Sequence, residues 1–448
     1  MNTARTRGST SSHGCGIPDN TQTRPLELLE APVRIYNRAF TDFLLEMRAS
    51  PHGDIFTPDE LNLASRLVAA ASAVYSSENH RTETFYNLLM EVVQPEIGRG
   101  TSSVRLHPMG TRIIGETKRD RFLAFSPAKP SSVSEPSDGF SDPSQAQRSC
   151  YIAVYASEFE PFVQSLFCPI LLLSSTGTRV RVYGAIFAHD LLVDQLTDDV
   201  TAHPDGHIDI QHVAQFIRST RSAINKVTSI FATRGTPDTW GQRQLFPFLD
   251  DIALDNGGGW YVGYERRLAA QYLQKSVFRA TIRARGDIYD WHAVVVKFAA
   301  TYCKDAHELL AHQSPPLAPK LWHCAWEEQV SMYVVIMDYI AEPATRMVDA
   351  PDAVKRTHLE SLRTAVETLH AHGWVVGDLR EQNVFLCGDS VQLVDFDWAG
   401  KEGEVRYPYD INLSDKSIIG WHEGVSRGEL IEKEHDEHML KKIIDLYT

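Results

Sequence analysis

Apolar residues in the first half of the chain recur mostly at helical spacing. Over 32–49 they follow one another every three or four positions, which predicts a helix that buries one face. Residues 57–60 (TPDE) combine a threonine N-cap, a proline in the first turn and a capping-box glutamate, so a second helix is predicted over 58–74. Similar spacing predicts further helices over about 78–93, 145–166 and 208–231, and short apolar runs predict strands over 102–106, 112–116, 170–174 and 180–187.

In the second half, strand-like segments come first. Alternation of apolar and polar residues over 277–282 and an apolar run over 293–298 predict two strands joined by a turn around 285–287. Two more strands are predicted over 321–326 and 332–340.

Helical spacing returns towards the C-terminus. Residues 357–360 (THLE) are interpreted as a capping box that starts a core helix, whose apolar stripe is Leu359, Leu362, Val366 and Leu369. A closing helix over 429–446 is predicted to bury Leu430, Leu440, Ile443 and Ile444. Strands followed by helices indicate an α+β domain.

Segments without periodicity divide the chain. Residues 1–30 have almost no apolar face to bury, which predicts a disordered tail. Residues 126–147 are rich in Ser and Pro and are interpreted as a mobile insertion within the first domain. Glycine and proline interrupt regular structure over 234–255, which indicates a boundary. We therefore predict one domain over 31–245 and another over 246–448.

Charge and cysteine usage narrow the function classes. A formal net charge of −14 at pH 7 argues against a general nucleic-acid or anionic-membrane surface. The six cysteines include no C-x-x-C pair, so neither a zinc site nor a disulfide framework is indicated. No apolar run approaches the length of a membrane span. We expect an intracellular protein, cytoplasmic or nuclear, without a membrane or nucleic-acid partner.

The segment 376–383 (VGDLREQN) carries the clearest chemical signal. Asp378 precedes Asn383 by five positions, and Asp395 follows at the end of an apolar run over 391–394. Phosphoryl transfer requires a carboxylate that orients the acceptor hydroxyl and two oxygen ligands that hold Mg²⁺. We therefore expect Asp378 to act in catalysis, and Asn383 and Asp395 to bind the metal.

This arrangement resembles the protein kinase-like superfamily, in which H-R-D-L-x-x-x-N is followed by D-F-G. Gly377 stands where protein kinases commonly have arginine, and Asp397 stands where they have the glycine of D-F-G. Both departures look like aminoglycoside and choline kinases and the atypical RIO kinases, so a small-molecule acceptor is an alternative to a protein. The resemblance implies that Asp378 is the catalytic base and that Arg380 approaches the transferred phosphate.

The resemblance also implies nucleotide-binding residues upstream. Lys297, in V-V-V-K-F, matches the lysine of V-A-I-K that contacts the α and β phosphates of ATP, and Glu308 would be its ion-pair partner. Met337, Asp338 and Ile340 fall at the position of the kinase hinge, whose backbone would bind adenine.

Over its second half the chain is similar to the fungal-type kinases related to Crinkler effectors, in which a nuclease-like domain precedes a short kinase domain. The resemblance implies a bilobal kinase-like fold, with an N-lobe over about 265–340 and a C-lobe over about 341–448. It also implies transfer from ATP, with Mg²⁺, to a protein serine or threonine. Only 53 residues follow Asp395, so a trimmed C-lobe is expected. Among them, Asp436 either anchors the catalytic loop from beneath or is a solvated acid.

The first domain resembles the PD-(D/E)XK fold, an α/β restriction-endonuclease-like fold. The resemblance rests on the E-x-K formed by Glu116 and Lys118, and on Glu91 in the preceding helix. Between Glu96 and Glu116, however, there is no Asp or Glu to serve as the other metal ligand. We therefore expect a degenerate nuclease-like domain, with nucleic-acid cleavage as the alternative.

The absence of a glycine-rich loop leaves a further alternative open. Residues 265–275, where such a loop would cover the phosphates, contain no glycine. This favours a catalytically silent nucleotide-binding or scaffold module. The presence of Lys297, Asp378, Asn383 and Asp395 favours an active kinase.

Overall fold

The protein combines helices with sheets. The computed structural model describes residues 32–49, 56–77, single positions between 80 and 92, 104–108, 121–127, 169–176, 179–187, 191–202 except 199, 207–233, 246–268 except 255 and 256, 275–413 except 288, and 419–448. Two compact units emerge: an N-terminal unit of Glu30–Thr301 and Leu321–Tyr339, and a C-terminal unit containing Tyr302–Lys320 and Ile340–Thr448. Among the described helices, none has both the length and the apolar character needed to cross a bilayer.

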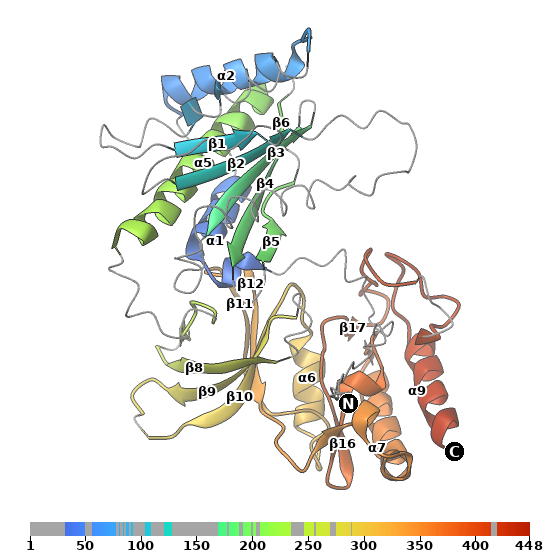
Figure 1. Cartoon of the computed structure of the whole chain (residues 1–448). Helices are drawn as coiled ribbons and strands as arrows, with labels where there is room; N and C mark the ends of the chain where they lie inside the picture. The colour runs from blue at the N-terminus through green and yellow to red at the C-terminus, as the bar shows by residue number, and fades with distance from the viewer. Residues whose placement is uncertain are drawn as a thin grey trace, which may run out of the picture. The chain divides into compact units, whose positions relative to one another are not determined.

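The first sheet of the N-terminal unit has the strand order β1-β2-β3-β4-β5, with β6 paired to β4 (Figure 1). The β1–β2 and β2–β3 pairs are parallel, and the others are antiparallel. The strands are β1 (Val104–Pro108), β2 (Arg121–Pro127), β3 (Ile170–Thr176), β4 (Arg179–Phe187), β5 (Leu191–Gln195) and β6 (Val200–Thr201). The helices are α1 (Arg38–Arg48), α2 (Pro58–Ser72) and α5 (His207–Thr233), and α5 packs against the other two.

The beginnings of the first two helices follow from their caps. Helix α1 begins only at Arg38, after a 3₁₀ turn, because Asn37 accepts the backbone N–H of Ala39 at 2.9 Å. The predicted capping box of α2 is confirmed: Thr57 accepts the N–H of Glu60, whose carboxylate accepts the N–H of Thr57 in return.

The second sheet of the N-terminal unit is antiparallel throughout, in the order β11-β12-β10-β9-β8-β7 (Figure 1). Its strands are β7 (Asp251–Ala253), β8 (Gly259–Leu268), β9 (Val277–Ala284), β10 (His292–Ala299), β11 (Leu321–Glu327) and β12 (Met332–Asp338). The four strands predicted in this region are confirmed to within two residues at each end, and β7 and β8 were not predicted.

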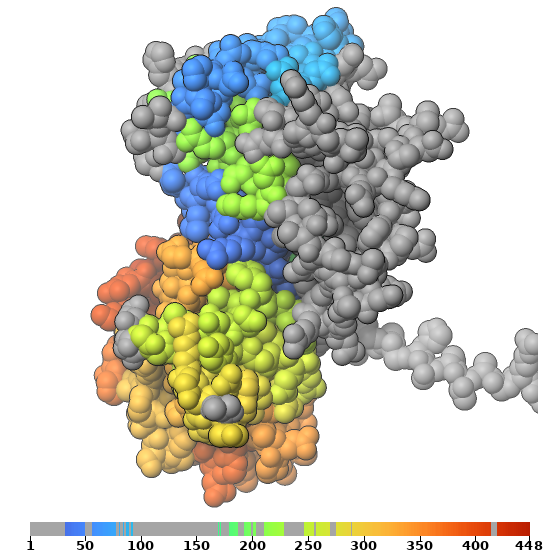
Figure 2. All heavy atoms as spheres, turned by 90° about the vertical axis from the view of Figure 1, so that its left-hand side faces the viewer, coloured from blue at the N-terminus to red at the C-terminus, as the bar shows by residue number. Residues whose placement is uncertain are grey.

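Both sheets of the N-terminal unit contribute to one hydrophobic core. Phe40 of α1 belongs to the same buried cluster as Phe278 of β9 and Ile336 of β12. The backbone N–H of Phe248 donates to Ile35 O at 3.0 Å. Figure 2 shows the blue atoms of α1 directly against yellow-green and orange atoms of the second sheet. The packing therefore crosses the sequence-based boundary at about residue 245, and that boundary stays a prediction.

The C-terminal unit is mostly helical with short strands. Strands β13, β15 and β16 form one antiparallel sheet, and β14 pairs with β17. The elements are α6 (Lys304–Ala311), β13 (Thr345–Arg346), α7 (Asp352–Ala371), β14 (Trp374–Val375), β15 (Val384–Cys387), β16 (Ser390–Leu393), β17 (Gly400–Lys401) and α9 (Lys433–Tyr447). Leu362 and Leu369 of α7 share a buried core with Met439 and Ile443 of α9.

Some further details of the sequence prediction were also wrong. The capping box at 357–360 is not a helix start, because α7 begins at Asp352 and the Thr357 hydroxyl donates to Val354 O inside the helix. The closing helix begins at Lys433, since the preceding segment pairs with an earlier one: Tyr407 N–H donates to Glu429 O at 2.9 Å. Strand β2 was missed, and it includes the first two residues of the predicted insertion over 126–147.

Other predicted elements are covered only in part. The described positions of the third helix, 80, 84, 87, 88, 91 and 92, are helical. The predicted strand over 112–116 and helix over 145–166 lie outside the described residues.

Candidate active site

A turn with left-handed backbone presents Asp378. It connects β14 to a 3₁₀ turn, Glu381–Asn383, and Gly377 within it has φ +78°. A Cβ added to Gly377 would lie 2.9 Å from Ile431 Cδ1 and 3.1 Å from the backbone oxygen of Trp398. Both the conformation and the packing thus require glycine where kinases commonly have arginine.

The Asp378 carboxylate is held from two sides. Its Oδ1 lies 2.7 Å from Arg380 Nε, and its Oδ2 accepts from Arg380 Nη2 at 3.1 Å. Asn383 Nδ2 donates to the backbone oxygen of Asp378 at 3.0 Å and to its Oδ2 at 3.1 Å. All three side chains are buried. The carboxylate therefore has one fixed orientation, with a cation beside it.

Asp436 anchors this turn, which was one of the two roles that the sequence suggested for it. Its Oδ2 accepts the N–H of Val376 at 2.7 Å, and its Oδ1 accepts the N–H of Gly377 at 2.9 Å. His370 Nε2 lies 3.1 Å from Oδ2. The alternative of a solvated acid was wrong, because only 1% of the residue is exposed.

Asp395 follows a residue that bonds the backbone of Asn383, and its own backbone is constrained. Its φ of +72° is uncommon for a residue other than glycine, although aspartate tolerates it better than most. The N–H of Val394 donates to Asn383 O at 2.9 Å, and Phe396 O accepts the N–H of Cys303 at 3.0 Å. Hydrogen bonds of the residues before and after Asp395 thus hold its backbone in this conformation. Surrounding structure commonly holds strained residues of this kind in place.

The oxygens of Asn383 and Asp395 suit Mg²⁺. Because Nδ2 of Asn383 faces Asp378, its Oδ1 is the branch left to act as a ligand. Across the described ranges, no group of three or more His, Cys, Asp or Glu residues could hold a metal ion by itself. Mg²⁺ commonly binds one or two protein oxygens and takes its other ligands from phosphates and water.

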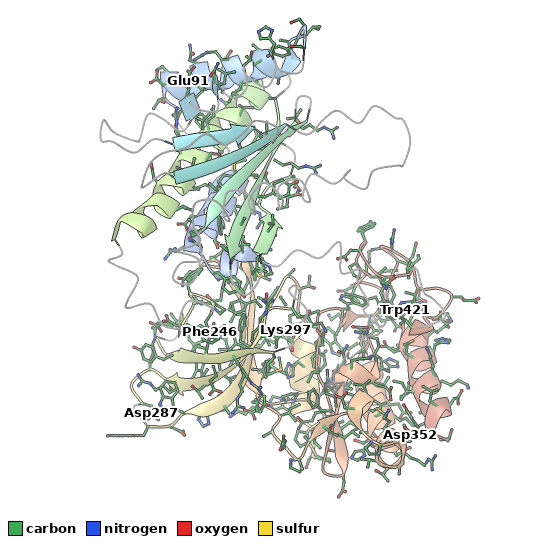
Figure 3. The ribbon with its side chains drawn as sticks, in the orientation of Figure 1. Glu91, Phe246, Asp287, Lys297, Asp352 and Trp421 are labelled. Atoms are coloured by element: carbon green, nitrogen blue, oxygen red, sulfur yellow. The ribbon has the colours of Figure 1, made fainter. Side chains whose placement is uncertain are left out.

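The second sheet carries three of the predicted nucleotide-binding residues. Lys297 is buried near the end of β10 (Figure 3), opposite Val335 of β12. Met337 is buried at the end of β12, and Asp338 Oδ1 accepts the indole N–H of Trp322 at 2.5 Å.

Glu308 and Ile340 lie in the C-terminal unit. The carboxylate of Glu308 is 3.7 Å from Lys304 Nζ, and its side chain is 42% exposed. Ile340 is half-buried and follows β12 by two residues. The expected ion pair between Lys297 and Glu308 stays a prediction.

Sequence reasoning missed a cluster of polar side chains next to the turn that carries Asp378. Tyr447 Oη donates to Glu381 Oε1 at 2.6 Å, and Lys355 Nζ donates to Tyr447 Oη at 2.8 Å. Burial acts to lower the pKa of Lys355, but the hydrogen bonds with Tyr447 and Glu381 raise it overall. No signal in the spacing could reveal this cluster, because its members come from α7, the 3₁₀ turn Glu381–Asn383 and α9.

A buried tyrosine also lies close to the turn. Burial, together with the charges of Asp436 and Asp378, raises the pKa of Tyr407. Its hydroxyl contacts Nδ1 of His435 at 3.3 Å, and burial lowers the pKa of that histidine. Tyr407 therefore stays a neutral phenol beside the anchoring carboxylate.

Of the predicted nuclease residues, only Glu91 lies among the described residues. Glu91, labelled in Figure 3, pairs with both terminal nitrogens of Arg66 on α2, one of them at 2.8 Å. Hydrogen bonding to that guanidinium lowers the pKa of Glu91. Glu116 and Lys118 lie outside the described residues.

Comparison with known proteins gives limited similarity. The family model described as lipopolysaccharide core biosynthesis protein (WaaY) matches residues 325–412, a segment that contains Asp378, Asn383 and Asp395. Among solved structures, the PK-1 kinase of Cydia pomonella granulovirus is 17% identical, over 42% of this chain and 70% of that chain, with a TM-score of 0.31. No curated protein matches the chain.

Proposed function

We propose that this protein is a protein kinase-like phosphotransferase that uses ATP and Mg²⁺ and transfers phosphate to a serine or threonine of a protein. The observation that supports the proposal is the turn anchored by Asp436, in which Asn383 donates to the Asp378 carboxylate and accepts the N–H of Val394, the residue before Asp395. These groups supply the carboxylate and the two metal ligands that phosphoryl transfer needs.

Asp378 is the group proposed to act on the acceptor. Its carboxylate would accept a hydrogen bond from the acceptor hydroxyl, orient the oxygen for attack and take its proton as the bond to phosphorus forms. Arg380, already paired with Asp378 at 2.7 Å, would place positive charge next to the transferred phosphoryl group.

Asn383 and Asp395 are proposed to hold Mg²⁺, which when bound would neutralise charge on the phosphates of ATP. By the same resemblance Lys297 would contact the α and β phosphates, with Glu308 as its partner. Met337, Asp338 and Ile340 would bind the adenine.

Two alternatives have specific support. The absence of glycine over 265–275 supports a nucleotide-binding module without catalysis. The family match over 325–412, to a protein of lipopolysaccharide core biosynthesis, supports a small-molecule or sugar hydroxyl as acceptor instead of a protein.

Thermal unfolding of the full chain with Mg²⁺ and ATP tests binding. We expect ATP to raise the Tm only when Mg²⁺ is present, and Asp395→Asn to remove most of that shift, because a neutral amide holds the metal less well. Asp389→Asn, in the exposed turn between β15 and β16, is the matched control. An unchanged shift in Asp395→Asn would exclude the proposed metal site.

Mass spectrometry of the products tests catalysis and acceptor class. A phosphoserine or phosphothreonine supports the proposal. ATP binding without any product supports the silent module, and a phosphorylated small molecule supports the other acceptor.

We also propose a structural role for the domain over 31–245. The pairing of Glu91 with Arg66 and the core shared with the second sheet support it. Mg²⁺-dependent cleavage of DNA or RNA that disappears in Lys118→Ala would contradict it.

A further inference from the structure

One side of the second sheet carries Lys297 together with an arginine. Residues directly opposite in an antiparallel pair project to the same side, as do residues two apart in one strand. Val295 lies opposite Arg279 of β9 and Met337 of β12, and it precedes Lys297 by two positions. Arg279, Met337 and Lys297 therefore share one side of the sheet. The other side faces the hydrophobic core through Phe278, Ala280, Val296 and Ile336.

Contacts with Tyr339 and Glu265 hold the planar guanidinium of Arg279 on this side of the sheet. Its Cζ lies 4.6 Å from the centroid of the Tyr339 ring, and its Nε lies 2.9 Å from Glu265 Oε2. Tyr339 itself is fixed by its N–H, which donates to Ala293 O at 3.1 Å. The ring covers one face of the guanidinium and the carboxylate one edge, yet 34% of the arginine side chain stays exposed.

Arg279 lies closer to where the base of a nucleotide would bind than to where its phosphates would bind. Arg279 lies in the same cross-strand row as Met337, whereas Lys297 lies in the next row with Val277 and Val335. The charge of Arg279 is already balanced by Glu265, so it gains little from a phosphate. Its planar surface remains suited to stacking on an aromatic ring.

We infer that Arg279 binds the purine base of the nucleotide by stacking, with Tyr339 supporting it from behind. The inference rests on the proposed function, because Lys297 and Met337 define where phosphates and base would lie. Stacking on Arg279 would add affinity for the nucleotide where residues 265–275 contain no glycine to form a phosphate loop.

Calorimetry tests the inference by measuring how tightly the full chain binds Mg·ATP, adenosine and inorganic tripolyphosphate. Arg279→Met removes the planar group, and Arg279→Lys keeps the charge without it. Arg283→Met is the matched control: Arg283 lies on the same side of β9, over the rings of Tyr261 and Trp291 at 4.8 and 5.2 Å, but four residues farther along the strand.

We expect both Arg279 variants to bind adenosine and ATP about tenfold more weakly, as is typical for loss of one stacking partner. Tripolyphosphate binding should be unchanged in both, and Arg283→Met should behave as wild type. Far-UV circular dichroism and the Tm of each variant check that it is folded.

Three results would overturn the inference. Adenosine binding by Arg279→Met as tight as wild type would exclude stacking, and full recovery in Arg279→Lys would show that charge alone matters. Weaker tripolyphosphate binding with unchanged adenosine binding would assign Arg279 to the phosphates. A wild-type protein that does not bind ATP at all would instead overturn the proposed function, and this inference with it.

Discussion

The carboxylate of Asp436 on α9 accepts the backbone N–H of Gly377 at 2.9 Å, although the two residues are 59 positions apart. The same carboxylate accepts the N–H of Val376 and contacts His370 of α7. A side chain of the last helix therefore sets the backbone of the turn that carries Asp378.

Replacing Asp436 with asparagine should destabilise the protein by about 2 to 3 kcal/mol, because the amide keeps one acceptor oxygen and turns an NH₂ group towards a buried N–H. Urea unfolding of the full chain measures this. Asp445→Asn on the same helix is the control, since its carboxylate is 59% exposed and should cost less than about 0.5 kcal/mol. Equal effects of the two substitutions would contradict the anchoring role.

Two glycines with the same backbone conformation should differ in their tolerance of alanine. Gly373 and Gly377 have φ of +79° and +78°, but only Gly377 has side chains and backbone within 3.1 Å of an added Cβ. Gly373→Ala should cost about 1 kcal/mol for the conformation alone. Gly377→Ala should cost at least about 1 kcal/mol more, through overpacking, and should lower the Tm further. A larger loss at Gly373 would contradict the crowding.

Substitution of Glu60 should have an effect that depends on pH. Hydrogen bonds from Arg218 lower the pKa of Glu60 from 4.5 to about 2 in the folded protein. A carboxyl group whose pKa is lower in the folded than in the unfolded protein stabilises the fold at pH values above its unfolded pKa. This stabilisation is lost as the pH falls towards the pKa of the folded protein. Glu60→Gln should therefore cost about 2 kcal/mol at pH 7 and progressively less between pH 5 and pH 2. The free energy of unfolding of wild type and variant, measured between pH 2 and pH 7, tests this, and Asp59→Asn is the control. A difference between wild type and Glu60→Gln that does not change with pH would exclude the ion pair as its cause.

Loss of one hydroxyl group from the cluster of Lys355, Glu381 and Tyr447 should destabilise the protein. Tyr447→Phe removes the hydroxyl that bonds both Lys355 and Glu381, which also pair directly at 3.2 Å, but keeps the ring, which lies 4.7 Å from Lys355 Nζ. We expect a loss of about 1 to 3 kcal/mol, since both hydrogen bonds involve a charged partner. Tyr409→Phe, at a position that is 81% exposed, should change the Tm little. Similar losses in both variants would contradict a specific role for the Tyr447 hydroxyl.

Binding and catalysis should separate in Asp378→Asn. The substitution removes the proposed proton acceptor but leaves Asp395 in place, so ATP affinity should stay nearly the same while turnover falls by about 10² to 10⁴-fold. Phosphate incorporation and ATP binding are measured on the same preparations. Labelling that persists undiminished in the variant would refute the assignment.

Activity should not require prior phosphorylation of the protein. By the resemblance to protein kinases, Gly377 stands at the position of an arginine that commonly connects their catalytic loop to a phosphorylated activation segment. Phosphatase treatment before the assay should therefore leave the rate unchanged, and a rate that disappears would contradict this expectation.

The sequence alone identified the elements with strong local signals. The capping box at Thr57 and the alternation over 277–282 correctly placed α2 and β9, because caps and strand periodicity depend on neighbouring residues. The spacing of Asp378, Asn383 and Asp395 pointed to one site; in the structure Asn383 donates to Asp378 and accepts the N–H of Val394, which precedes Asp395, and the site itself stays a prediction. Local signals failed at Thr357, where a capping-box pattern occurs inside a helix that begins at Asp352.

Tertiary structure alone decided how that site is supported. The partners of Asp436 and Lys355 come from segments far apart in the chain, and no local pattern encodes such contacts. The core that joins α1 to the second sheet likewise depends on which apolar faces meet. Periodicity shows that a face is apolar, but the shape and packing of the folded chain determine what it is buried against.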